Sequence, residues 1–396
     1  MERAIGSLRV RRILVICTRQ IGDVLLTTPL IAAAKARWPE ATLDVLGFAG
    51  TLGMLKGNPD VHAFVDVPPG SGWLDSLGLI RRLWRHYDLA FVAQYSDRAH
   101  LYGAVAARHR SGLVLSDRRD SWWKRALLDH AVTVDHNQTH AVLEKLRLIA
   151  PWSPPPDAIR VVPPPGAALP DALARRLAAR HVVVHVPTLV RYKQWPIEHH
   201  VTLVRALADD GVQVLLSGGP SKPDMERTAE VLAGAGAAAR DDRVIDIAGT
   251  LGLDQLATLL RGAALYIGPD TSITHLAAAL ETPIVAIYGP IDPRLWGPWS
   301  QGHGPTQPYV ERALAQRVGR TVLLQGDQPC VPCSRAGCDR HNDSRSECLE
   351  TLSPQRVLAE ARRILGLRTA GEGVSIPIAP VLETPPRVAA GAASTR

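Results

Sequence analysis

The chain has 396 residues, of which 46% are hydrophobic and 21% charged, and these proportions are typical of a globular protein with two or three domains. No apolar run reaches the roughly 18 residues that a membrane-spanning helix needs. The run that follows Arg9–Arg12 leads into Arg19 and Asp23 without the small residues of a signal-peptide cleavage site. We therefore expect a cytoplasmic protein.

The net charge of +7 is concentrated in the first part of the chain. Residues 1–165 carry 21 Lys or Arg and 15 Asp or Glu, a net of +6, whereas the remainder carries 24 and 23, a net of +1. This imbalance favours an anionic partner, such as an acidic glycolipid or the inner membrane surface, although solvated arginines would give the same count. The basic and aromatic segment Ser121–Arg125 belongs to no nucleic-acid motif, so no nucleic-acid partner is expected.

Strand-like and helix-like segments alternate through the first 150 residues, as in a parallel sheet covered on both faces. The predicted strands are Ile13–Cys17, Ala41–Gly47, Ala63–Val67, Leu89–Ala93 and Ser111–Leu115, and the predicted helices are Val24–Arg37, Leu74–Arg85 and His140–Ile149.

Two Pro-Pro-Pro runs then lie between Pro151 and Pro170, where neither a helix interior nor a central strand would tolerate them. We predict a semi-rigid linker over 161–175 between an N-terminal domain, 1–160, and a C-terminal domain, 176–366. The Ala-, Gly- and Pro-rich residues 367–396 predict a disordered tail.

The strand and helix alternation resumes after the linker, which predicts an α/β fold of two Rossmann-like α/β/α domains facing each other across a cleft. In such sheets, ligands bind outside the carboxyl ends of the strands. The predicted strands are His181–Val186, Val212–Ser217, Val244–Ile247, Leu265–Ile267 and Ile284–Tyr288, and the predicted helices are His199–Asp209, Met225–Leu232, Leu253–Arg261 and Leu276–Leu280.

The segment Tyr266–Pro290 predicts a strand, a turn, a helix and a second strand. Asp270, Thr271 and Ser272 follow the first strand as candidate helix N-caps, and His275 falls on the same helical face as Thr271. A helix start offers free backbone N–H groups and a positive dipole end, which suit a phosphate group. An ordinary capped helix with a half-buried histidine is the alternative.

A second candidate site follows the first strand. Gly22 permits a tight turn, and Asp23 opens the next helix at the crevice between the two proposed domains. Asp23 is either a capping carboxylate or a general base that faces a ligand across the crevice.

Several motifs, taken together, resemble glycosyltransferase family 9, the heptosyltransferases that build the inner core of bacterial lipopolysaccharide. Their order and spacing match that family over roughly residues 12 to 360. The matching segments are Ile21–Pro29, Tyr192–Pro196, Asp246–Leu256 and Asp270–Leu280.

The resemblance implies a GT-B fold, with an N-terminal acceptor-binding domain and a C-terminal nucleotide-sugar-binding domain. It also implies an enzyme that transfers a heptose, with inversion, from an ADP-heptose-type donor to a lipopolysaccharide inner-core acceptor, an anionic glycolipid. No cofactor is implied for catalysis. Such an enzyme would work in the cytoplasm, with peripheral contact at the inner face of the inner membrane.

The resemblance also assigns roles to individual residues. It makes Asp23 the general base that takes the proton of the acceptor hydroxyl, and it pairs Lys193 with the donor phosphates. The other residues implied on the donor side are Asp270, Thr271, Ser272, His275, Gly218 and Gly219, and we expect Arg19, Gln20 and Gly22 on the acceptor side.

Two departures from the family pattern concern the donor. Ser272 stands where the family usually has Gly, and Val186–Val190 lacks the Asn-Pro-Gly often seen before the lysine. Two alternatives to this function also remain: a heptosyltransferase acting on a protein hydroxyl, as in autotransporter-modifying relatives, and a non-catalytic nucleotide-sugar-binding protein of the same fold. A Rossmann dehydrogenase is disfavoured because no Gly-x-Gly-x-x-Gly follows the first strand.

Four of the five cysteines, Cys330, Cys333, Cys338 and Cys348, lie within nineteen residues. In a reducing compartment such a cluster favours a structural zinc or iron over disulfides, and His341 could replace one ligand. Protein-modifying relatives in the resembled family bind iron with a cysteine cluster here. A thiolate set that is fully used leaves no open position for catalysis.

Overall fold

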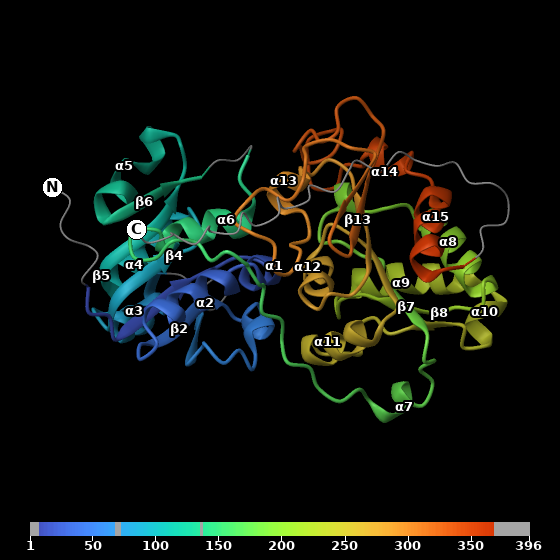
Figure 1. Cartoon of the computed structure of the whole chain (residues 1–396), viewed down its shortest axis with the longest axis horizontal. Helices are drawn as coiled ribbons and strands as arrows, with labels where there is room; N and C mark the ends of the chain where they lie inside the picture. The colour runs from blue at the N-terminus through green and yellow to red at the C-terminus, as the bar shows by residue number, and fades with distance from the viewer. Residues whose placement is uncertain (1–7, 68–72, 135–137, 368–396) are drawn as a thin grey trace, which may run out of the picture.

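This computed structural model describes residues 8–67, 73–134 and 138–367, so the predicted tail lies outside the described residues from position 368 onward. Two parallel sheets, each flanked by helices, form two Rossmann-like α/β/α domains, as predicted (Figure 1). The first sheet has the order β3-β2-β1-β4-β5-β6, and all its pairs are parallel. Its strands are β1 Arg12–Ile16, β2 Thr42–Phe48, β3 Ala63–Val67, β4 Tyr87–Val92, β5 Ala107–Val114 and β6 His130–Thr133.

The second sheet has the order β12-β13-β11-β10-β7-β8-β9, and only the edge strand β12 runs antiparallel to its neighbour. Buried Val, Ile and Leu side chains dominate its central strands, as expected for strands covered on both faces. The strands are β7 His181–His185, β8 Gln213–Ser217, β9 Val244–Asp246, β10 Leu265–Pro269, β11 Ile284–Tyr288, β12 Ala315–Val318 and β13 Thr321–Gln325.

Helices connect these strands and cover both sheets (Figure 1). No helix in the described part of the chain is both long and apolar enough to cross a membrane. In the first domain the helices are α1 Ile21–Leu25, α2 Thr28–Arg37, α3 Trp73–Leu83, α4 Asp97–Ala106, α5 Arg118–Leu127 and α6 Ala141–Leu146, with short 3-10 turns η2 Leu52–Leu55 and η3 Arg147–Ile149. The remaining ones are α7 Asp171–Ala174, η4 Arg191–Lys193, α8 Ile197–Asp209, α9 Lys222–Ala235, α10 Ala237–Arg240, α11 Leu253–Gly262, α12 Ser272–Ala279, α13 Pro293–Trp296, α14 Glu347–Glu350 and α15 Pro354–Leu365.

Without its edge strand, the second sheet has the same topology as the first. In chain order within each domain, both sheets follow the pattern 3-2-1-4-5-6. The strand order therefore reverses between β1 and β4 in one domain and between β7 and β10 in the other. Ligands of such folds bind at the carboxyl ends of these strand pairs, which is where the predicted site residues fall.

One predicted helix is wrong. The segment Val24–Arg37 forms two helices, because α1 ends at Leu25 and α2 begins at Thr28. Pro29 has no N–H to donate and sits in the first turn of α2, where helices accept proline. The Thr27 hydroxyl donates to the carbonyl oxygen of Asp23 at 2.7 Å and so stabilises the break.

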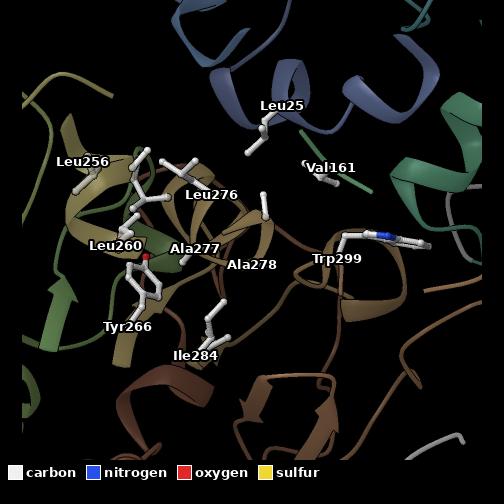
Figure 2. Close-up of a cluster of buried hydrophobic side chains, with 14 of the residues drawn as sticks. Leu25, Val161, Leu256, Leu260, Tyr266, Leu276, Ala277, Ala278, Ile284 and Trp299 are labelled. Atoms are coloured by element: carbon white, nitrogen blue, oxygen red, sulfur yellow. The ribbon is translucent and has the colours of Figure 1, made fainter. Parts of the chain in front are cut away.

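Segments from both domains and from the linker share one buried apolar cluster (Figure 2). Leu25 of α1 and Leu276 of α12 belong to it, and so does Val161 of the predicted linker. Gln301 holds Val161 in place, since its side chain accepts from the Val161 N–H and donates to the Val161 carbonyl. The start of the linker is therefore fixed against the C-terminal domain.

Helices α1 and α12 approach each other between the two domains (Figure 1). A Cβ atom added to Gly22 would lie 3.2 Å from the Ser272 Cβ, which is closer than most real contacts. Glycine at position 22 therefore permits this close approach. The two helix N-termini, and the residues that follow β1 and β10, consequently face the same small region.

Candidate active site

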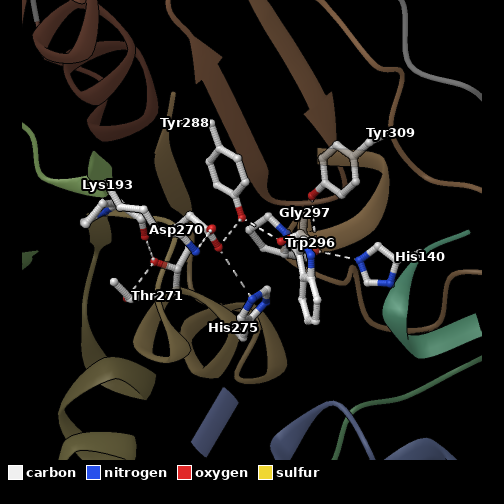
Figure 3. A network of polar contacts seen from close by, with 12 residues as sticks. His140, Lys193, Asp270, Thr271, His275, Tyr288, Trp296, Gly297 and Tyr309 are labelled. Carbon is white, nitrogen blue, oxygen red and sulfur yellow. Dashed lines mark hydrogen bonds and ion pairs between the residues drawn. The ribbon is translucent and has the colours of Figure 1, made fainter. Parts of the chain in front are cut away.

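Lys193 and Asp270 form an ion pair at the carboxyl ends of β7 and β10. Lys193 ends the 3-10 turn that follows β7, and Asp270 directly follows β10. Lys193 Nζ lies 2.6 Å from Oδ2 of the buried Asp270 (Figure 3). Burial lowers the pKa of Lys193, but the charge of Asp270 and its hydrogen bond outweigh this effect and raise the pKa above its usual value. Lys193 is therefore a fixed, charged group and not a mobile surface lysine.

The other carboxylate oxygen of Asp270 faces two rings (Figure 3). The Tyr288 hydroxyl lies 3.4 Å from Asp270 Oδ1 and donates at 2.7 Å to the Trp296 carbonyl. His275 Nε2 lies 4.0 Å from the same Oδ1. Burial lowers the pKa of His275, against the charge of Asp270, so the imidazole is neutral at pH 7. Asp270 is thus held by side chains and is not a helix cap.

The N-terminus of α12 offers hydrogen-bond donors beside this ion pair. Thr271 is the N-cap residue, yet its side chain makes no capping hydrogen bond, and Ser272 begins the helix. The first-turn N–H groups therefore lack a side-chain cap, which suits an anionic ligand. His275 Nδ1 is also buried without a hydrogen-bond partner among the described residues, a position that a ligand can satisfy.

Asp23 lies across the domain interface from this group. It is the third residue of α1 and not its cap, because the helix begins after Gln20. Its side chain is buried, with Oδ2 3.2 Å from Arg19 Nε and Oδ1 4.0 Å from Lys145 Nζ. Lys145, on α6, is itself buried. One carboxylate and two cations therefore meet at the carboxyl end of β1.

Lys145, Trp296 and Tyr95 also belong to the site, and none of them was predicted from the sequence. The Trp296 ring, from the C-terminal domain, lies 5.9 Å from both the Arg19 guanidinium and the Lys145 ammonium. The Tyr95 hydroxyl accepts a hydrogen bond from Arg19 Nη1 at 3.5 Å. A lysine within the apolar stretch Ala141–Leu146 was a signal for a buried cation. Trp296 gave no local signal, because its role depends on packing between domains.

The glycine pair after β8 has a packing role. A Cβ at Gly218 would lie 2.9 Å from Thr228 Oγ1, and one at Gly219 would collide with the Asp224 carboxylate. Both glycines therefore allow α9 to pack close to the end of β8. Cys17 directly follows β1 and is fully buried, and this burial raises the pKa of its thiol, which leaves it unreactive.

The two halves of the site act on each other electrostatically. Burial and the charge of Asp270 have the largest effects on the pKa values of Lys193 and His275, and the charge of Asp23 has a smaller effect on both. A carboxylate that can accept a proton thus faces a lysine and a helix N-terminus that can stabilise negative charge. This arrangement suits a reaction in which a hydroxyl oxygen attacks the transferred group and a phosphate leaves it.

Comparison with known proteins agrees with this geometry. The sequence model of Glycosyltransferase family 9 (heptosyltransferase) matches residues 77–314, more than half of the chain. The chain belongs to glycosyltransferase family 9. Lipopolysaccharide heptosyltransferase 3 of Escherichia coli is 29% identical to this glycosyltransferase over 297 residues, which cover 72% of this chain and 84% of the relative.

Solved structures show the same GT-B fold as this family 9 enzyme. The E. coli ADP-heptose lps heptosyltransferase II has a TM-score of 0.66 and 23% identity, and the match covers 89% of this chain and 98% of that one. The E. coli heptosyltransferase WaaC, solved with ADP-2-deoxy-2-fluoro heptose, has a TM-score of 0.63 and 20% identity, with 89% and 99% covered.

The four clustered cysteines of this glycosyltransferase lie between β13 and the start of α14. Burial raises the pKa of Cys348, and Cys333, Cys330 and Cys338 raise it further, so these three thiols lie within electrostatic range of Cys348. Among the described residues, however, no group of three or more His, Cys, Asp or Glu side chains is arranged to hold a metal ion. The iron-containing glycosyltransferase TibC of E. coli matches with a TM-score of 0.53 and 15% identity, over 91% of this chain and 78% of that one. The metal stays a prediction.

Proposed function

We propose that this enzyme transfers a heptose from an ADP-heptose-type donor to a lipopolysaccharide inner-core acceptor, with inversion and with Asp23 as general base. The proposal assigns acceptor binding to residues 1–160 and donor binding to residues 176–366. One observation carries it: Asp23 and the Lys193–Asp270 pair occupy the strand-order reversals of two facing sheets. The names of the relatives and the ligand of the WaaC structure support the sugar and the nucleotide.

The proposed reaction has one chemical step. The acceptor hydroxyl oxygen attacks the anomeric carbon of the heptose while its proton moves to the Asp23 carboxylate. Each carboxylate oxygen has two acceptor sites, so the Arg19 contact leaves room for this hydroxyl. The bond from the anomeric carbon to the phosphate oxygen breaks, and its electron pair leaves with ADP.

The donor side stabilises the charge that develops on the diphosphate. Lys193 supplies a fixed cation, and the uncapped first turn of α12 supplies backbone N–H groups. Asp270 orients the Lys193 ammonium through its 2.6 Å contact. These groups need no divalent metal to perform this task.

A glycolipid acceptor fits the basic N-terminal half of the chain, and a peripheral position at the inner face of the inner membrane forms part of the proposal. A protein hydroxyl is the second candidate acceptor, favoured by the grouped thiols of Cys330, Cys333, Cys338 and Cys348. A non-catalytic binding protein would not need both Asp23 and Lys193, and this chain has both.

We further propose that the four cysteines hold a structural zinc or iron, which suits their thiolate chemistry. The metal would link β13 to α14 and take no part in transfer. Metal analysis of protein purified under reducing conditions should find about one zinc or iron per chain, and Cys338→Ser should lose it and melt at a lower temperature. Purified wild-type protein that contains no metal and melts at the same temperature as Cys338→Ser would contradict this assignment.

Calorimetric titration with ADP, UDP, GDP and CDP tests the proposed function. Wild-type protein should prefer ADP, and Lys193→Ala should bind ADP about 10- to 100-fold more weakly because a charged hydrogen bond is lost. Lys222→Ala is the matched control, because Lys222 is an exposed lysine of the same domain. Failure to bind any nucleotide would contradict the assignment of the donor site. Preference for UDP or GDP would mean that the donor carries another sugar.

A further inference from the structure

A pocket of about 470 Å³ opens in the N-terminal domain, at the carboxyl ends of β4 and β5. Its volume lies within the roughly 300–1,000 Å³ typical of small-molecule sites. The predicted acceptor-side residues Arg19, Gln20 and Gly22 do not line it. The lining residues are Tyr95, Ser96, Asp97, Leu115, Arg119, Trp123 and Lys124.

The pocket adjoins the general base through a short chain of contacts. Tyr95 forms part of its wall, and the Tyr95 hydroxyl accepts a hydrogen bond from Arg19. Arg19 in turn contacts Asp23 at 3.2 Å. A ligand in this pocket would therefore lie on the Asp23 side of the active site, opposite the donor-binding residues.

The polar side chains of the pocket carry a net positive charge. Lys124 is buried, and its ammonium contacts Asp97 Oδ1 at 2.6 Å and the Tyr95 carbonyl at 2.8 Å. An ammonium has three N–H donors, so one remains for a ligand. The Arg119 guanidinium makes no ion pair or side-chain hydrogen bond with any described residue. Two cations therefore face one carboxylate.

Trp123 gives the pocket a fixed aromatic wall. Its ring lies 5.6 Å from Lys124 Nζ and packs edge-on against His100 at 6.4 Å. An indole face offers a large apolar surface at low entropic cost. The Asp97 carboxylate and the Ser96 hydroxyl beside it can bind hydroxyl groups. An apolar face, hydroxyl partners and a free arginine together suit a sugar ring that carries a negative charge.

We propose that this pocket binds an acidic sugar of the acceptor, with the ring against Trp123 and its carboxylate or phosphate on Arg119. Arg119 is then the residue that selects a charged acceptor sugar, because a planar guanidinium binds such anions with paired hydrogen bonds. This inference rests on the proposed function and deepens it. It favours the glycolipid over a bare protein hydroxyl, which brings no charged sugar.

Ligand-observed NMR titration tests the assignment, with galacturonate, galactose and inorganic phosphate as probes of wild type and Arg119→Ala. Wild-type protein should bind galacturonate at least about tenfold more tightly than galactose or phosphate, and Arg119→Ala should abolish this preference. Arg108→Ala is the matched control and should keep the preference for galacturonate. Arg108 is exposed at the start of β5, at the opposite end of the strand from the pocket.

Equal binding of galactose and galacturonate, or an unchanged preference in Arg119→Ala, would overturn the proposal. Phosphate that binds as tightly as galacturonate would overturn the sugar assignment. ADP affinity measured on the same samples distinguishes failure of the pocket assignment from failure of the proposed function. ADP binding without sugar selectivity contradicts only this pocket, whereas absence of ADP binding contradicts the proposed function itself.

Discussion

The N-terminal and C-terminal sheets share one strand order, but the loops at their order reversals carry different chemistry. After β1, a five-residue helix presents a carboxylate, Asp23, between two cations. After β7 and β10, a cation, Lys193, is held by the carboxylate of Asp270 beside an eight-residue helix. The shared scaffold thus fixes where the groups lie. In the proposed mechanism, the loop residues decide which side accepts a proton and which side binds an anion.

The Asp23 side and the Lys193 side of the site also differ in which domain supplies the contacts that fix them. Asp23 and Arg19 rely on Trp296, which reaches them from the other domain. Lys193 and Asp270 both belong to the C-terminal domain and pair within it. Donor binding should therefore survive a disturbance of the interface that impairs transfer.

The largest effect is expected from Asp23→Asn. This change keeps the size of the side chain but removes the proposed proton acceptor, so kcat should fall by about 10²- to 10⁴-fold. ADP affinity should stay unchanged, because the Lys193 side of the site is untouched. Steady-state transfer assays together with ADP calorimetry measure both quantities. Asp241→Asn, on an exposed acid, is the control, and an Asp23→Asn enzyme within threefold of wild-type kcat would exclude this base.

Gly22→Ala should directly disturb only the contact between α1 and α12. The new Cβ would meet the Cα and Cβ of Ser272 at 3.3 and 3.2 Å, and we expect a loss of about 1–3 kcal/mol in the free energy of unfolding together with weaker transfer. Urea unfolding and kcat/KM check the two effects.

A second substitution, Ser272→Gly, removes part of the clash and should restore some of the stability lost in Gly22→Ala. Gly78→Ala is the matched control, because no atom lies within 4 Å of a Cβ at that position. A Gly22→Ala protein as stable and active as the Gly78→Ala protein would mean that the close approach of α1 and α12 does not matter.

The interface should also weaken in acid, because of His140. This histidine caps α6 and donates from Nε2 to the Gly297 carbonyl of the other domain at 2.8 Å (Figure 3). Its Nδ1 accepts from the Val142 N–H. Burial lowers its pKa to about 3 from the usual 6.5, so the unfolded chain binds the proton more readily. Its contribution to stability is complete above pH 6.5 and declines as the pH falls toward 3, by about 2 kcal/mol at pH 5.

Urea unfolding at pH 7 and pH 5 measures this decline, and His140→Gln should reduce it. His62→Gln, which alters an exposed histidine, should leave the decline as in wild type. Equal pH dependence in wild type and His140→Gln would show that this histidine does not couple the domains to pH.

The smallest effect is expected from Trp296→Leu. The substitution removes two cation–π contacts, with Arg19 and Lys145, each worth about 0.5–1 kcal/mol. We expect kcat/KM to fall several-fold with little change in ADP affinity, as measured by transfer assays and calorimetry. An equal loss of ADP affinity would place Trp296 on the donor side.

Each strand that the sequence predicted overlaps an observed strand, because buried runs such as Ile284–Tyr288 carry a strong local pattern, but β6, β12 and β13 were not predicted. It did not predict α4 and α5, whose mixed composition gives only a weak helical pattern. The break between α1 and α2 was also missed, although Pro29 marks it.

In the candidate site, too, some residues were predicted from local patterns and others were not. Motif residues such as Asp23 and Asp270 were found in advance because they follow strands. The close approach of Gly22 to Ser272 and the position of Trp296 could not be predicted, since both depend on how the two domains pack. Local sequence patterns identify the loops that carry the chemistry, and tertiary packing decides what those loops meet.

A crystal structure with ADP bound would show directly which residues contact the diphosphate. We predict that Lys193 Nζ and the first-turn N–H groups of α12 contact the diphosphate, with Asp23 facing the point where the sugar would be attached. ADP bound elsewhere, with Lys193 in contact only with Asp270, would contradict the proposed donor site and the facing position of Asp23.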